Sequence, residues 1–140
     1  MSVVLDTSVL LALLNRRDPA HPAAVAWWDS QGDAVRTTPL VLAEVDHLLT
    51  ARAGRAGAAA LRTALRQEEL VDRWWDGASA ASAEVAERYA DLGLGLTDAS
   101  LVVLAGRERT VRLATLDERH FRAVRPLDGS PAFTLLPADA

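Results

Sequence analysis

The chain has 140 residues with 15 basic and 19 acidic side chains, and its formal net charge of −4 argues against a broad, sequence-independent nucleic-acid binder. Apolar residues make up 50% and charged residues 24%, as in ordinary globular proteins, so we expect one domain over residues 1–140. Cysteine is absent, which excludes disulfides, thiolate metal sites and thiol nucleophiles.

The first half of the chain alternates short apolar runs with helical patterns. Residues 2–5 form a β-branched run typical of a buried strand, and Pro39 is suited to the first turn of a helix. We expect strands at 2–5 and 34–37 and helices at 7–15, 22–30, 39–53 and 56–67.

The second half continues this alternation. Residues 69–74 form a strand or a connector, and Thr97 is expected to cap the helix that it begins. We expect helices at 80–91, 97–109 and 117–123 and strands at 111–115 and 133–136. Short apolar strands alternating with helices predict an α/β fold with a mostly parallel central sheet and helices on both faces.

Two further features exclude other classes of protein. All 15 basic residues are arginine, whereas Walker-type NTPases, response-regulator receivers and haloacid-dehalogenase-like phosphatases each rely on a lysine. No stretch reaches the ~20 apolar residues of a membrane span. The N-terminal apolar run is broken by Asp6 and lacks a basic start, so we expect no signal peptide and a cytoplasmic location.

Four acids lie at the edges of segments that otherwise belong to the core: Asp6, Glu44, Asp98 and Asp117. Asp6 and Asp117 follow expected strands, where open α/β sheets bind ligands, and the other two lie on helices after connections. Carboxylates that converge repel one another unless a cation lies among them. An all-oxygen set of ligands predicts Mg²⁺ or Mn²⁺.

Each acid also has a purely structural interpretation. Asp6 and Asp117 are suitable helix N-caps, and Asp98 would complement the dipole of its helix. Glu44 shares a helix face with apolar neighbours, which predicts a position near the core edge, where an unpaired carboxylate is costly. For Glu44 the alternative is an ion pair with a nearby arginine.

The residues around the four acids occur in a characteristic order: Val-Leu-Asp-Thr-Ser, Leu-Ala-Glu-Val, Leu-Thr-Asp-Ala-Ser and Ala-Thr-Leu-Asp-Glu-Arg-His-Phe. With these motifs the chain resembles the PIN domain, in particular the VapC toxins of bacterial toxin–antitoxin pairs. The resemblance extends from Val3 to about Leu136. No motif is specific alone, but four in order with matching element types are strong.

The resemblance implies a Rossmann-like three-layer α/β/α fold and a Mg²⁺- or Mn²⁺-dependent endoribonuclease. It carries the metal-ligand acids onto Asp6, Glu44, Asp98 and Asp117, in that order. It also implies that Thr7 or Ser8, together with Thr115, supports the pocket by hydrogen bonding. One departure is His120, which stands where the family often has a further Asp.

The same resemblance implies an antitoxin of the VapB kind as partner, and a toxin homodimer within a larger complex. Arg112, Arg119 and Arg122 are candidates for holding RNA phosphates, and a solvated basic face is the alternative. A non-cleaving PIN-like module and an RNA-processing nuclease without a toxin role stay open as other functions. A small-substrate phosphatase is disfavoured, because Ser8 stands where its Asp-x-Asp motif needs an acid.

Overall fold

Five short strands form one parallel sheet in the order β3-β2-β1-β4-β5 in the computed structural model, which describes all 140 residues. The strands are β1 (Ser2–Leu5), β2 (Ala34–Thr37), β3 (Val71–Asp72), β4 (Arg112–Ala114) and β5 (Thr134–Leu136). Every neighbouring pair is parallel, which confirms the expected sheet. Residues 3–5 are fully buried, as suits a central strand covered on both faces.

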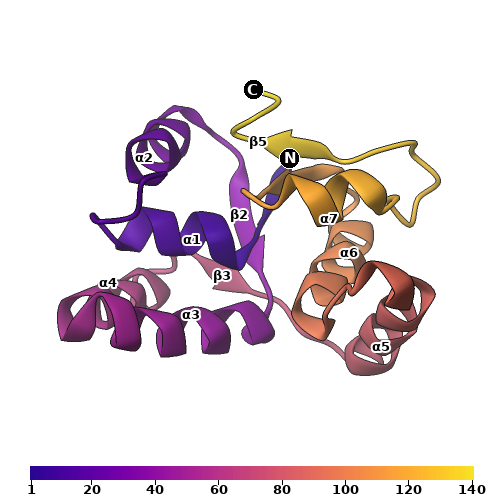
Figure 1. Cartoon of the computed structure of the whole chain (residues 1–140), viewed down its shortest axis with the longest axis horizontal. Helices are drawn as coiled ribbons and strands as arrows, with labels where there is room; N and C mark the ends of the chain where they lie inside the picture. The colour runs from indigo at the N-terminus through magenta and orange to yellow at the C-terminus, as the bar shows by residue number, and fades with distance from the viewer.

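Helices cover both faces of this sheet (Figure 1). They are α1 (Thr7–Leu14), α2 (His21–Ser30), α3 (Pro39–Arg52), α4 (Gly54–Arg66), α5 (Ala78–Arg88), the 3₁₀ turn η1 (Ala90–Leu92), α6 (Leu96–Glu108) and α7 (Glu118–Ala123). In Figure 1, α1 to α4 lie to the left of the sheet and α5 to α7 to its right. The expected three-layer α/β/α arrangement is therefore confirmed. None of the helices is long and apolar enough to cross a bilayer.

The expected helix boundaries hold to within two residues, except where η1 replaces the last turn expected after Arg88. The prediction that Thr97 caps α6 is wrong. The helix begins at Leu96, and Gly95 is its cap without any side-chain hydrogen bond. Thr97 instead lies inside the first turn, where its carbonyl accepts the hydroxyl of Ser100 at 2.6 Å.

One cluster of 30 buried hydrophobic residues forms the core. Helix α6 is its central element, since all seven residues from Ala99 to Ala105 are buried. Helix α3 presents a narrower stripe of Val41, Val45 and Leu49, and the short α7 is anchored by Phe121, which is 1% exposed. The acids on these three helices are therefore carried by elements that the core holds in place.

The order of the strands determines where the acids lie. The chain winds from β1 through β2 to β3 in one direction and then crosses to β4 and β5 on the other side. The direction reverses between β1 and β4, and the carboxyl ends of strands at such a point form a ligand crevice. Helices α1, α3 and α7 begin at this edge because each follows a strand. Helix α6 begins there because it runs back to feed β4.

Candidate metal centre

Asp6 is a buried carboxylate at the end of the central strand, with 4% of its surface exposed. Its Oδ1 accepts the N–H of Thr7 at 2.7 Å, and its Oδ2 accepts the hydroxyls of Ser8 and Thr115 at 2.9 and 2.6 Å. Burial raises the pKa of Asp6 although these three bonds oppose the rise. Asp6 thus caps α1 and also places a buried carboxyl group at the crevice.

Two hydroxyl groups join the ends of β1 and β4. The Oγ1 of Thr115, which is 1% exposed, donates to Asp6 and accepts the N–H of Asp117 at 3.0 Å. Ser8 donates to Asp6 and accepts the N–H of Leu116 at 2.9 Å. Thr7 contributes its backbone N–H only, because its buried Oγ1 has no partner. Ser8 and Thr115 are therefore the side chains that support Asp6.

Asp98 lies in the first turn of α6, and its side chain is 23% exposed. No protein donor forms a hydrogen bond with its carboxylate, and the one basic nitrogen within 4.0 Å is Nδ1 of His120 at 3.7 Å. The pKa of Asp98 is raised to about 6, first by burial and then by the charges of Asp6 and Asp117, with a smaller effect of Glu44. His120 opposes this rise. The other three predicted acids therefore lie within electrostatic reach of Asp98.

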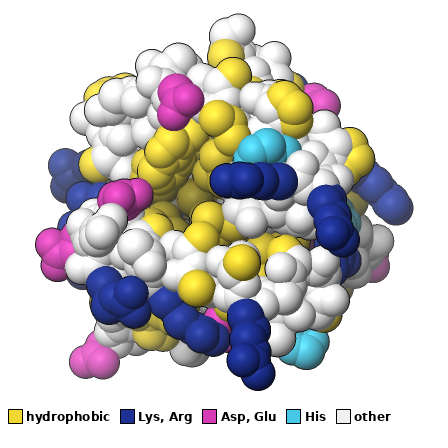
Figure 2. All heavy atoms as spheres, turned by 90° about the vertical axis from the view of Figure 1, so that its left-hand side faces the viewer, with side chains coloured by type: hydrophobic (Ala, Val, Ile, Leu, Met, Phe, Trp, Pro, Cys, Tyr) yellow, Lys and Arg dark blue, Asp and Glu magenta, His cyan; other side chains and the backbone are white.

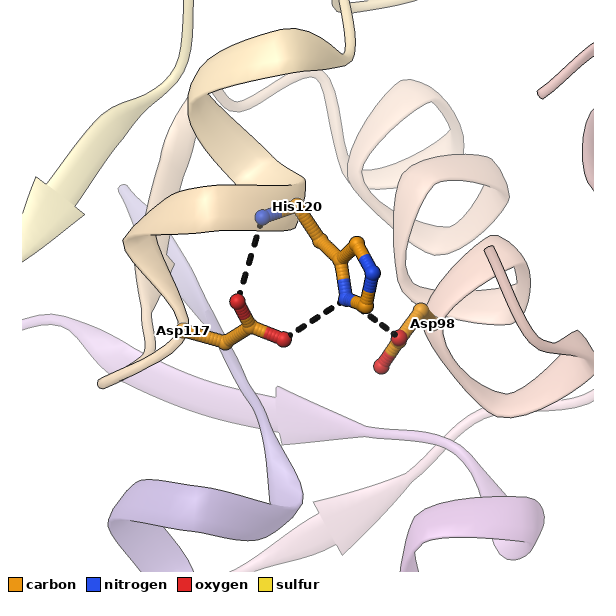
Figure 3. A group of neighbouring side chains, drawn as sticks. All are labelled: Asp98, Asp117 and His120. Carbon is orange, nitrogen blue, oxygen red and sulfur yellow. Dashed lines mark hydrogen bonds and ion pairs between the residues drawn. The ribbon is translucent and has the colours of Figure 1, made fainter. Parts of the chain in front are cut away.

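Asp117 begins α7 and meets Asp98 through His120, as Figure 3 shows. Its Oδ1 accepts the backbone N–H of His120 at 3.1 Å, and its Oδ2 lies 2.8 Å from Nδ1 of the same residue. The side chains of Asp98, Asp117 and His120 each offer one ligand atom, and these three atoms lie within 4.8 Å of one another. The structure thus adds a histidine to the cluster of acids.

Glu44 is exposed, and the prediction that it lies near the core edge is wrong. The buried stripe of α3 runs through Val41, Val45 and Leu49, one helical position away from Glu44. Glu44 takes part in none of the ion pairs of the structure, so the alternative of an arginine partner finds no support. Its charge still raises the pKa of Asp98, which places it at the rim of the cluster.

The sequence analysis missed three buried hydroxyl groups that hold the elements of the site together. Thr37 donates to the carbonyl of Leu5 at 2.8 Å and so ties β2 to the end of β1. The hydroxyls of Thr38 and Ser100 lie 2.9 Å apart and join the start of α3 to α6. Polar residues within apolar segments of the sequence could have indicated these hydroxyls, because a buried hydroxyl needs a hydrogen-bond partner.

The three arginines predicted to hold RNA differ in their surroundings. Arg112 begins β4 and pairs with Asp33 at 2.8 Å, at the sheet edge opposite to the acids. Arg122 pairs with Glu118 at 2.8 Å and with Asp139 at 2.7 Å, and this arginine holds the pKa of Asp139 down at about 2. Arg119 is exposed and has no acidic partner. Of the three, Arg119 alone is free to meet a phosphate near the acids.

The side chains of the cluster fit a divalent cation. Asp98 offers a carboxylate without a hydrogen bond, and Oδ1 of Asp6 accepts only one. Hard oxygen ligands of this kind suit Mg²⁺ and Mn²⁺. The N-termini of α1, α3, α6 and α7 face this edge and offset part of the negative charge, but burial and the charges of Asp6 and Asp117 still raise the pKa of Asp98. A bound cation would relieve it.

The model of the PIN domain family matches residues 3–126. The chain belongs to the PIN domain family. This PIN domain is 39% identical over 142 residues to Ribonuclease VapC26 of Mycobacterium tuberculosis, covering 96% of the chain and 100% of the relative. It is 34% identical over 119 residues to Ribonuclease VapC29 of the same species, covering 84% of the chain and 86% of the relative.

Solved structures share the architecture of this PIN domain. VapC20 of M. tuberculosis aligns with a TM-score of 0.76 at 24% identity, over 83% of this chain and 90% of that one. VapBC2 from Rickettsia felis aligns with a TM-score of 0.60 at 16% identity, over 91% of this chain and 96% of that one. At such identities the likeness establishes the fold alone.

Replacing Thr115 by Val tests the link between β1 and β4. We expect the free energy of unfolding to fall by about 2 kcal/mol, because a buried carboxylate loses a donor and the N–H of Asp117 loses its acceptor. Urea unfolding in EDTA at pH 7 measures this change. Thr134→Val is the matched control, since this strand hydroxyl makes no hydrogen bond, and an equal loss in both variants would contradict the assignment.

The raised pKa of Asp98 predicts how stability depends on pH. The folded state keeps its proton up to about pH 6, whereas the unfolded state releases it near the ordinary value of 3.8. The native state therefore loses stability as pH rises between these values, in the absence of a cation. We expect Asp98→Asn to raise Tm at pH 7.5 and to change it little at pH 4.

Calorimetry of the EDTA-treated protein measures the Tm at both pH values. Each kcal/mol of gained stability should raise the Tm by roughly 4 °C. Asp91→Asn, at an exposed acid on η1, is the control and should leave Tm unchanged at both pH values. A divalent cation that binds only the folded state should raise the Tm of the wild type more than that of Asp98→Asn. Equal Tm differences at pH 4 and pH 7.5 would refute the raised pKa of Asp98.

Proposed function

We propose that this PIN domain is a divalent-metal-dependent endoribonuclease and the toxin of a type II toxin–antitoxin pair. The observation that carries the proposal is the Asp98 carboxylate, half-buried without a hydrogen bond and close to Asp6 and Asp117 at the switch point of the sheet. Full-length similarity to a relative named a ribonuclease supports the same reaction. One domain over residues 1–140 and a cytoplasmic location are parts of the proposal, and the lack of cysteine agrees with the latter.

The reaction is hydrolysis of an RNA phosphodiester, whose transition state concentrates negative charge. A divalent ion at the cluster would polarise the scissile phosphate and lower the pKa of a bound water. Asp98 and Asp6 are the ligands we favour, because Asp98 is unpaired and Asp6 is held rigidly. Glu44 is exposed and free of ion pairs, so it can accept the proton of the attacking water or act as a further ligand.

The alternative functions share this fold. They differ from the proposal in whether RNA is cleaved or in whether an antitoxin is bound. A non-cleaving module has no use for four converging acids, whose repulsion destabilises the native state. An RNA-processing nuclease would use the same chemistry and would lack an antitoxin. VapC20 is described as a toxin that cleaves the sarcin-ricin loop, but at 24% identity its RNA target is not carried over to this chain.

An apolar groove supports a protein partner, which we propose to be an antitoxin of the VapB kind. The groove has a volume of about 210 Å³ and lies among α1, α2 and α4. It is lined by Leu10, Leu13, Leu14, Val25, Trp28, Ala64, Glu69 and Leu70. Figure 2 faces the side of the molecule where these helices lie and shows apolar side chains in a hollow there. A solvent-accessible groove lined by partly buried apolar side chains is a suitable site for an apolar segment of a partner. A homodimer is part of the same proposal.

Cleavage of labelled total RNA tests the proposed reaction. We expect the purified full chain, freed of any partner, to give discrete products with Mg²⁺ or Mn²⁺ and none with EDTA. Asp98→Asn should lower the rate by more than about 100-fold, because it removes a proposed ligand, whereas Asp91→Asn should keep it. Intact RNA in every lane with a folded, metal-bound protein would favour the non-cleaving module.

Arginines without acidic partners gather at the far end of α1 and α3. Arg16 and Arg17 follow α1, Arg52 ends α3, and all three line an open hollow of about 640 Å³. Since α1 has eight residues with a rise of 1.5 Å each, this hollow lies roughly 12 Å from the acids. Figure 2 shows dark blue arginine side chains across this face. We propose that RNA extends from the acids to these arginines.

The salt dependence of RNA binding tests this path. In the cleavage-deficient Asp98→Asn background, changing Arg16, Arg17 and Arg52 together to Gln should lower the slope of log K against log salt by roughly 2, about 0.7 for each phosphate contact on a single strand. Filter binding of a labelled single-stranded RNA measures the slope. Arg88→Gln on α5, on the other side of the sheet, is the control. An unchanged slope in the triple variant would remove the arginines from the path.

A further inference from the structure

His120 stands inside the acidic cluster, and it is the feature that the proposed function does not yet use. Its Nδ1 lies 2.8 Å from Oδ2 of Asp117 and 3.7 Å from Oδ2 of Asp98. Figure 3 shows the imidazole turned toward both carboxylates, from α7 toward α6. Its side chain is 23% exposed, so most of the ring is buried beside the two carboxylates.

The distances from Nδ1 of His120 to the two carboxylate oxygens match the distances between neighbouring ligands of one ion. Ligands 2.1 Å from an octahedral ion lie about 3.0 Å from each other when adjacent. Ligands at about 2.1 Å in a tetrahedral site lie about 3.4 Å apart. The distances of 2.8 and 3.7 Å to Nδ1 bracket both values. The three side chains could therefore bind one ion with small adjustments when Nδ1 of His120 carries no proton.

The position of His120 is fixed by the structure around it. Its backbone N–H donates to Oδ1 of Asp117, and the next residue, Phe121, is buried in the core. The backbone of His120 is thus fixed by a capping interaction and by packing, and the 2.8 Å contact of Nδ1 with Oδ2 of Asp117 orients the imidazole. A side chain ordered in this way loses little conformational freedom when it binds a metal.

We propose that His120 is a direct metal ligand beside Asp98 and Asp117 and that it makes this site prefer Mn²⁺ to Mg²⁺. The inference rests on the proposed function and deepens it. Mg²⁺ takes oxygen ligands and retains several waters, whereas an imidazole nitrogen suits the transition metals. A histidine in place of an acid also leaves one negative charge fewer to balance a hard cation. The addition of one imidazole to the carboxylates of the cluster therefore changes the choice of ion.

Pulsed electron paramagnetic resonance of Mn²⁺ added to the metal-free full chain tests ligation directly. We expect modulation from a directly bound ¹⁴N nucleus, replaced by the ¹⁵N pattern when the protein is labelled with ¹⁵N-histidine. This comparison needs no substitution and so does not depend on a variant that folds. His120→Asn should lose the modulation, and His47→Asn, at an exposed histidine of α3, should keep it.

Calorimetric titrations with Mn²⁺ and Mg²⁺ test the preference. We expect the wild type to bind Mn²⁺ more tightly, and His120→Asp to reduce the ratio of the two dissociation constants by about tenfold while still binding both ions. An unchanged ratio in His120→Asp would overturn the proposed preference. Loss of the modulation in His47→Asn instead of His120→Asn would overturn the assignment of the ligand.

The failure of this inference is distinguishable from failure of the proposed function. Tight Mn²⁺ binding and metal-dependent RNA cleavage without any nitrogen modulation would overturn the role of His120 and leave the nuclease standing. Absence of binding of either ion to the folded chain, with RNA intact, would overturn both.

Discussion

The buried carboxylate of Asp6 is the constraint on which the rest of the site depends. A charge that is 4% exposed at the end of the central strand is tolerable only with donors on every side. Those donors come from the start of α1 and from Thr115 after β4, so satisfying Asp6 requires the two strands to lie side by side. The same neighbours form the point where the sheet reverses its winding. Hydrogen bonding and topology therefore select the same crevice.

Around this charge the protein places acids that it does not neutralise. Four helices begin at the edge, and their N-termini offset part of the repulsion, yet the pKa of Asp98 is still raised to about 6. A domain selected for stability alone would pair that carboxylate or replace it. A residue that lowers the stability of the free protein is expected at a site where a bound ligand compensates for it. His120, directed at two of the acids, belongs to the same cluster and alters its chemistry.

Helix α1 connects the separate parts of the proposed function. Asp6 caps its first turn, Leu10, Leu13 and Leu14 line the apolar groove on its flank, and Arg16 and Arg17 follow its last residue. The twelve residues from Asp6 to Arg17 thus carry the proposed metal ligand, the proposed surface for a protein partner and the proposed approach for RNA. The chain has a net charge of −4, but Asp6 lies at one end of this helix and Arg16 and Arg17 follow its other end. That separation would let an acidic protein present a local positive surface to the proposed RNA.

The sequence by itself determined the elements of the fold and which acids would meet. Strands 2–5 and 111–115 and the helices between them follow from local periodicity, and acids after parallel strands share one edge whatever the details of packing. Only the tertiary structure decided the exposure of Glu44, the pairing of Arg112 with Asp33 and the place of His120 between Asp98 and Asp117. Each of these depends on which helix face packs or on residues distant in the chain. Local patterns carry no information about such distances.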